Sequence, residues 1–239
     1  MSNFVHAFEF IGHNGQIPGE QATLLQLTLE TLWIALLAMG ISLVIALPVG
    51  IGLGHIHRGS FVAINLGNVW RALPSLAVLA IGVAFLGIGL GNVLLALVVL
   101  AVPPIVTNAY VAVDGVDAEL VDAARGMGMT GWQLLRSVEL PLAVPLIMAG
   151  VRTAMLFVFS TTTISALTGF SGSLGDIVNN ETSYHLPGVL GAAICIAVLA
   201  LALDGILANV QRVLTPDGLR AQGTADPLDE LAVAVAEPA

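Results

Sequence analysis

Five long apolar runs constrain the fold of this chain more than any other feature. They cover approximately Thr31–Leu53, Val62–Leu86, Val93–Val113, Leu142–Leu167 and Val189–Val210. A helix needs about 20 apolar residues to cross the hydrocarbon core of a bilayer. The runs do not alternate as barrel strands would, and lipid requires each backbone to satisfy its own polar groups. We therefore predict an all-α fold, a polytopic membrane bundle of about five transmembrane helices.

Composition supports a lipid environment. Apolar residues make up 57% of the chain and charged residues only 10%, and the mean hydropathy is +0.95, which lies outside the range of water-soluble domains. We expect an extracytoplasmic segment over residues 1–23, a transmembrane domain over 24–219, and a disordered acidic cytoplasmic tail over 220–239. The lipid bilayer is an expected partner, and nucleic acid is not.

The arginines orient the chain in the membrane. There is no lysine, so seven arginines carry all the positive charge. Five of them fall on one side of the runs: Arg58, Arg125, Arg136, Arg212 and Arg220. The segments on the other side contain none. The positive-inside rule then places the N-terminus outside, and it places the C-terminus and the segment Asp114–Pro141 in the cytoplasm of a multi-pass cell (inner) membrane protein. Arg71 and Arg152 lie inside runs, where we expect them to snorkel toward the cytoplasmic end.

The segment Asp114–Pro141 is a polar interruption with helical features. Residues 117–124 favour a helix that begins with acidic residues, and Asp122 and Arg125 are spaced to pair along it. Gly126 and Gly128 are expected to break this helix and permit a tight reversal.

A second, short amphipathic helix is expected after the glycines. Thr130 and Gln133 have the spacing of a capping box. Trp132, Leu135 and Val138 would form one apolar stripe, with Arg136 and Glu139 elsewhere on the helix. Pro141 is expected to end it before the fourth span. One interpretation is an element that a groove on another protein can grip; the other is an ordinary loop that joins two spans.

Polar and helix-breaking residues inside the runs mark a candidate translocation path. They are Pro74, Ser75, Asn108, Thr161, Thr162 and Thr163. Hydroxyl and amide groups at that depth can line a route for a polar solute. They can equally bond back to the preceding helical turn or to a neighbouring helix. Asp204 is expected to make a structural hydrogen bond.

No constellation of catalytic or metal-binding residues is present in the sequence. There is no Gly-rich nucleotide loop, no cysteine pair and no His/Glu metal spacing. We therefore expect no cofactor and no enzymatic activity. If the chain moves a solute uphill, the energy enters through another subunit.

The polar segment resembles the EAA loop of ATP-binding cassette (ABC) importer permeases. The matching residues are Asp122, Ala123, Ala124, Gly128, Leu140 and Pro141, with Asp122 where the family usually has Glu. The resemblance implies a type I importer fold in which this loop is the cytoplasmic coupling helix. It also implies three protein partners: a cytoplasmic ATPase, a second permease chain (identical or paralogous) and an extracytoplasmic binding protein.

Two further segments resemble the osmoprotectant branch of that family, which imports glycine betaine, carnitine and choline. They are Asn68–Ala77, which ends in Leu73-Pro74-Ser75-Leu76-Ala77, and Gly172–Asp176. Arg71 stands where the branch usually has Gln. A permease for another small solute such as an amino acid stays open as an alternative. From a different class, an ATP-independent channel or a structural membrane subunit also stays open.

Overall fold

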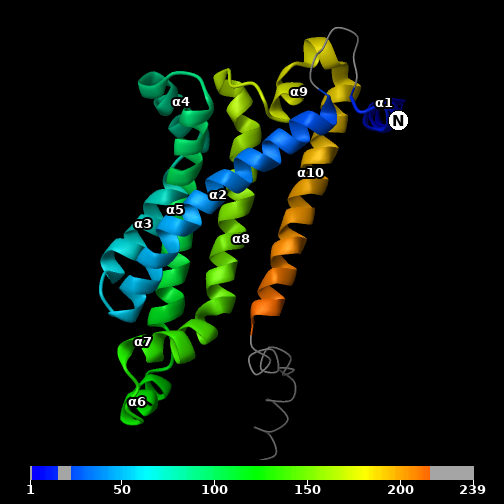
Figure 1. The fold of residues 1–239 in the computed structure, drawn as a ribbon. Helices are drawn as coiled ribbons and strands as arrows, with labels where there is room; N and C mark the ends of the chain where they lie inside the picture. Colours follow the sequence, from blue (N-terminus) through cyan, green and yellow to red (C-terminus); the bar gives the residue numbers. More distant parts are fainter. Residues whose placement is uncertain (1, 16–22, 216–239) are drawn as a thin grey trace, which may run out of the picture.

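The computed structural model describes residues 2–15 and 23–215, and within these ranges the chain is helical (Figure 1). The elements in order are α1 (Ser2–Gly12), α2 (Leu24–His55), α3 (Ser60–Ala72), α4 (Ser75–Leu86), α5 (Leu90–Asp114), α6 (Ala118–Gly126), α7 (Gly131–Leu134), the π-helical turn η1 (Leu135–Glu139), α8 (Leu140–Ile164), the 3₁₀ turn η2 (Ser165–Thr168), α9 (Gly175–Asn179) and α10 (Glu181–Leu214). The expected tail over 220–239 lies outside the described residues.

Four helical segments in the described ranges are long and apolar enough to cross a membrane. They are Leu24–His55, Leu90–Asp114, Gly131–Thr168 and Glu181–Leu214. They contain the first, third, fourth and fifth predicted spans, so the prediction of a polytopic helical bundle is confirmed.

The second predicted span, Val62–Leu86, is wrong as a single helix. The structure divides it into α3 and α4, which are separated by Leu73 and Pro74. Leu73 is extended, with φ −79° and ψ 116°. Proline disfavours the helical conformation in the residue that precedes it, so the helix ends before Pro74 and restarts at Ser75.

α5 is the central helix of the bundle and packs against both α2 and α8 (Figure 1). Small residues allow the close approach. A Cβ on Gly50 of α2 would lie 2.7 Å from Cβ of Ala109 on α5, and one on Gly150 of α8 would lie 2.5 Å from Cβ of Asn108. Larger side chains such as Leu97 and Phe159 fill the remaining core. Small residues at contacts between membrane helices are typical, because dispersion rather than hydrophobic burial holds the helices together.

α10 is joined to α8 by a polar contact inside the bundle. Arg152 donates from Nε and Nη2 to the two carboxylate oxygens of Asp204, over 2.9 and 2.8 Å. Gln211 adds a bond from Nε2 to the carbonyl oxygen of Pro145. Asp204 therefore has the structural role expected of it. Arg152 pairs with Asp204 in the structure, and snorkelling of Arg152 toward the cytoplasmic end stays a prediction.

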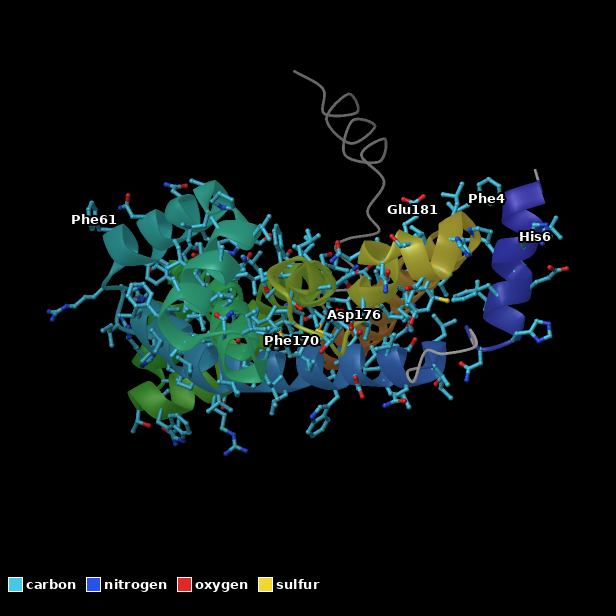
Figure 2. All side chains as sticks on the ribbon, turned by 90° about the horizontal axis from the view of Figure 1, so that it is seen from above. Phe4, His6, Phe61, Phe170, Asp176 and Glu181 are labelled. Atoms are coloured by element: carbon cyan, nitrogen blue, oxygen red, sulfur yellow. The ribbon has the colours of Figure 1, made fainter. Side chains whose placement is uncertain are left out.

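The two ends of the molecule differ. α6 and α7 form one end, and α4, α9 and the start of α10 form the other, with α1 beside α10 (Figure 1). Seen from above, Phe170 and Asp176 lie between Phe61 at one extreme and Phe4 of α1 at the other (Figure 2). All the arginines of the described chain lie at the α6–α7 end or within the helices that lead to it.

Candidate functional site: a coupling segment and two cavities

The predicted coupling segment, Asp114–Pro141, called the coupling segment below, forms two short helices that pack on each other. Asp117 caps α6, because its Oδ1 accepts from the backbone N–H of Glu119 over 2.9 Å. Val121 and Ala124 of α6 are buried against Leu134 at the end of α7. The predicted pair between Asp122 and Arg125 is present on the exposed face, at 3.8 Å. The segment is thus a small folded unit with its own apolar cluster.

Gly128 alone makes the reversal between the two helices. Its φ is +85°, in the left-handed region, and a Cβ there would meet no other atom within 4 Å. The left-handed conformation is therefore what requires glycine at this position. Gly126 is the last residue of α6, so the helix ends between the two glycines where it was expected to break.

The capping box that begins the second helix is confirmed. Thr130 Oγ1 accepts from the N–H of Gln133, and Gln133 Oε1 accepts from the N–H of Thr130. The helix does not stop at Pro141 as expected, but continues from Gly131 to Thr168. The π turn at Leu135–Glu139 explains why the helix continues. A wider turn before Pro141 relieves the clash between the proline ring and the carbonyl four residues earlier.

The predicted apolar stripe of the second helix is partly wrong. Trp132 is 68% exposed, whereas Leu134 and Leu135 are buried. Glu139, expected on the polar side, is 1% exposed, and its Oε2 lies 2.6 Å from Nδ1 of His55 at the end of α2. A helix continuous through Pro141 places Glu139 one turn after Leu135, on the buried face. The sequence-based prediction ended the helix at Pro141, and it therefore placed Glu139 away from the apolar stripe.

The remaining motif residues divide into exposed and packed positions. Asp122 and Ala123 are exposed, and Ala124 is buried. Leu140 and Pro141 are half-buried at the start of α8. Two large apolar side chains of the segment are also exposed: Met127 is 74% exposed and Trp132 is 68% exposed. Exposed apolar groups on a charged surface can mark a protein-binding site.

Three of the six predicted path residues bond back to their own helices. Asn108 Nδ2 donates to the carbonyl of Pro104 over 2.7 Å. Thr162 and Thr163 donate to Val158 and Phe159, over 2.8 and 3.3 Å. Thr161 is 2% exposed.

Ser75 differs from these residues, because it lines a cavity of about 400 Å³ at the break between α3 and α4. Pro74 is exposed at that break, as is Leu73. A role in the translocation path stays a prediction for all six residues. Among them, Ser75 lines a cavity, as a residue of such a path would.

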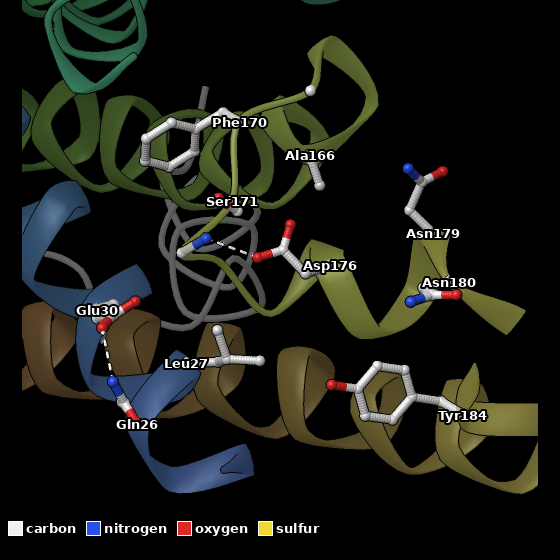
Figure 3. Close-up of a pocket in the computed structure, with 12 residues that line it drawn as sticks. Gln26, Leu27, Glu30, Ala166, Phe170, Ser171, Asp176, Asn179, Asn180 and Tyr184 are labelled. Atoms are coloured by element: carbon white, nitrogen blue, oxygen red, sulfur yellow. Dashed lines mark hydrogen bonds between the residues drawn. The ribbon is translucent and has the colours of Figure 1, made fainter. Parts of the chain in front are cut away.

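A larger cavity, of about 780 Å³, lies at the end of the molecule opposite the coupling segment (Figure 3). Two carboxylates line it, Glu30 and Asp176, together with two aromatic rings, Phe170 and Tyr184. No arginine or lysine is among its lining residues.

A glycine brings the two carboxylates of this outer cavity together. The N–H of Gly172 donates to Oδ2 of Asp176 over 2.6 Å. A Cβ on the same glycine would lie 3.1 Å from Oε2 of Glu30. Figure 3 shows the Tyr184 ring on the far side of Asp176 from Phe170, with its hydroxyl on the side of Leu27. Two carboxylates in a cavity with no arginine or lysine among its lining residues favour a bound cation over an anion.

Comparison with known proteins places these features in a family. Residues 46–215 match the model of the binding-protein-dependent transport system inner membrane component. A glycine betaine/carnitine/choline transport system permease protein, OpuCB of Bacillus subtilis, is 37% identical over 82% of this chain and 91% of that protein. A carnitine transport permease protein, OpuCB of Listeria monocytogenes, is 36% identical over 92% of this chain and 97% of that protein.

Solved structures agree on the fold. The chain aligns with one of the MetNI methionine ABC transporter, in an inward-facing conformation, with a TM-score of 0.69 at 23% identity. That alignment covers 81% of this chain and 96% of the MetNI chain. An amino acid ABC transporter aligns with a TM-score of 0.63 at 20% identity, over 87% of this chain and 97% of that chain. The chain belongs to the family of binding-protein-dependent transport system inner membrane components.

Proposed function

We propose that this chain is the membrane-spanning subunit of an ABC importer for a quaternary ammonium osmoprotectant, and that the coupling segment docks a separate ATPase. The observation that carries the proposal is the folded α6–α7 unit, in which Asp122, Met127 and Trp132 are all exposed. It occupies the arginine-bearing end, which the positive-inside rule assigns to the cytoplasm, with the N-terminus outside.

The mechanism follows from the continuity of the helix that carries this unit. A change of state in the ATPase moves α7, and the unbroken helix from Gly131 to Thr168 carries the movement into the membrane. A second permease chain supplies the other half of the path, and an extracytoplasmic binding protein delivers the solute. The spans then open alternately to the two sides.

Two observations support the substrate class. The relatives at 36–37% identity are named for glycine betaine, carnitine and choline. The outer cavity offers two carboxylates and two aromatic rings, and this combination suits a cation that has no hydrogen to donate.

Reconstituted transport tests this function. The permease is placed in proteoliposomes with its ATPase and binding protein, and uptake of labelled choline, glycine betaine, carnitine and methionine is measured with and without ATP. We expect ATP-dependent uptake of the three quaternary ammonium solutes and none of methionine. Uptake of methionine alone would assign an amino-acid permease, and ATP-independent flux would assign a channel.

A further inference from the structure

The cavity at the break between α3 and α4 lies beside the middle of α5. It is lined by Trp70, Leu73, Ser75, Leu100, Thr153 and Phe157, which come from four helices and the break itself. Leu100 lies about 15 Å along α5 from Leu90, at 1.5 Å per residue. A hydrocarbon core about 30 Å thick that begins near Leu90 would have this cavity near its centre.

The break cannot face lipid. Leu73 is 41% exposed in this chain and Pro74 is also exposed, and both are extended. Non-helical backbone at this depth is tolerated only where protein buries it or where it lines a water-filled cavity. By contrast, the groove on α2 from Trp33 to Ile45 is lined by apolar side chains on an unbroken helix, which suits lipid.

Two aromatic rings form a corner of this cavity. The ring centroids of Trp70 and Phe157 lie 4.5 Å apart, with the planes at 68°. Phe157 is 44% exposed, so part of its ring surface is open. A trimethylammonium group has no N–H to donate, and the faces of aromatic rings attract it through their quadrupoles.

The residues that line this cavity carry no charge, which suits a site that a solute binds and then leaves. The cavity has hydroxyls from Ser75 and Thr153 but no acidic side chain. Without a carboxylate, a zwitterion such as glycine betaine and a cation such as choline meet the same surroundings. Binding then stays weak enough for the solute to leave, as a transport path requires.

We propose that Trp70 and Phe157 form a binding site for the quaternary ammonium group within the permease itself. The solute occupies it between the outer cavity and the cytoplasm. This inference rests on the proposed function, and it adds a site of recognition in the membrane to whatever recognition the binding protein provides.

A neutral isostere tests the attraction. Binding of labelled choline to the permease–ATPase complex in nanodiscs, without binding protein, is competed with unlabelled choline or with 3,3-dimethylbutan-1-ol, in which carbon replaces the charged nitrogen. We expect the wild type to prefer choline about tenfold. Trp70→Leu should reduce the preference to about twofold, and Trp70→Phe should keep most of it. Trp33→Leu, on the lipid-facing groove, is the matched control. A preference that survives Trp70→Leu would overturn the proposal.

A second test of the site uses Ser75→Cys, which changes a single side-chain atom and so disturbs the fold little. Ser75→Cys is introduced with Cys195→Ala, so that the new thiol is the only one in the chain. Its rate of modification by a methanethiosulfonate reagent is then measured. We expect choline and glycine betaine to slow modification several-fold and 3,3-dimethylbutan-1-ol to leave the rate unchanged. Equal rates with and without choline would overturn the site.

The two proposals fail differently. If the wild-type transporter takes up no quaternary ammonium solute, the proposed function is wrong and the site falls with it. If the wild-type transporter instead takes up choline, while Trp70→Leu keeps the wild-type preference and choline does not slow modification of Ser75→Cys, only the site is wrong.

Discussion

Nδ1 of His55 lies 2.6 Å from Oε2 of Glu139, and this contact joins the C-terminal end of α2 to the π turn that precedes α8. Glu139 is 1% exposed, and within the described chain its second oxygen has no hydrogen-bond partner. This carboxylate therefore depends on one imidazole for its stability.

Removing that imidazole should destabilise the permease strongly. We expect His55→Ala to lower the free energy of unfolding by about 3 kcal/mol, because it leaves a buried carboxylate unpaired. Replacing both partners, as His55→Leu with Glu139→Leu, should recover most of the loss. Thermal unfolding in detergent measures both effects.

The control is the exposed pair of His57 and Asp114, at 2.8 Å. His57→Asn keeps a residue that tolerates the positive φ of that position. It should cost less than about 1 kcal/mol. Equal losses for the two histidines would contradict a special role for Glu139.

Gly128 and Gly126 should respond oppositely to the same substitution. Gly128→Ala forces a side chain into the left-handed region, at about 1–2 kcal/mol, and should disturb the reversal between α6 and α7. Gly126→Ala replaces a helical glycine and should be neutral or slightly stabilising. Solute-stimulated ATP turnover of the reconstituted transporter is the measurement. Full coupling in Gly128→Ala would count against the coupling role of the reversal.

Trp132 should contribute to docking of the ATPase. Its side chain is 68% exposed in the isolated chain, so Trp132→Ala should leave the thermal stability of the permease unchanged. Binding of the ATPase should weaken by about 2 kcal/mol, or roughly thirtyfold, as for an aromatic anchor at an interface. Affinity is measured between the purified ATPase and the permease in nanodiscs, with Trp33→Ala as control. An unchanged affinity would place the docking surface elsewhere.

Glu30 should favour cationic over zwitterionic solutes. Glu30→Gln removes one of the two charges at the outer cavity, and we expect choline uptake to fall about fivefold. Glycine betaine, whose own carboxylate is repelled there, should fall less. Glu9→Gln, on the exposed face of α1, is the matched control. A parallel fall for both solutes would show that Glu30 does not discriminate by charge.

The features predictable from the sequence depend on near neighbours in the chain. The capping box of Thr130 and Gln133 and the pair of Asp122 and Arg125 each span three residues, and both are present. The length and hydropathy of each apolar run are also properties of consecutive residues, so the sequence predicts them directly.

The features that could not be predicted depend on contacts between distant segments. His55 and Glu139 are 84 residues apart in sequence. The outer cavity unites Glu30 of α2 with Asp176 of α9, and the membrane cavity unites Trp70 of α3 with Phe157 of α8. The residue pattern within one helix does not indicate which residues of a distant helix it will contact. The break at Pro74 was missed because a hydropathy window averages over a single proline.

The unbroken helix from Gly131 to Thr168 makes the protein a mechanical device as well as a passage. A rod of this kind extends on the order of 55 Å, at 1.5 Å per residue. Trp132 in the first turn of this helix and Phe157 near the α3–α4 break belong to one continuous helix, so a tilt of its first turn would also displace the Phe157 ring. Under the proposed function, binding of the ATPase and binding of the solute would then be coupled mechanically through this one helix.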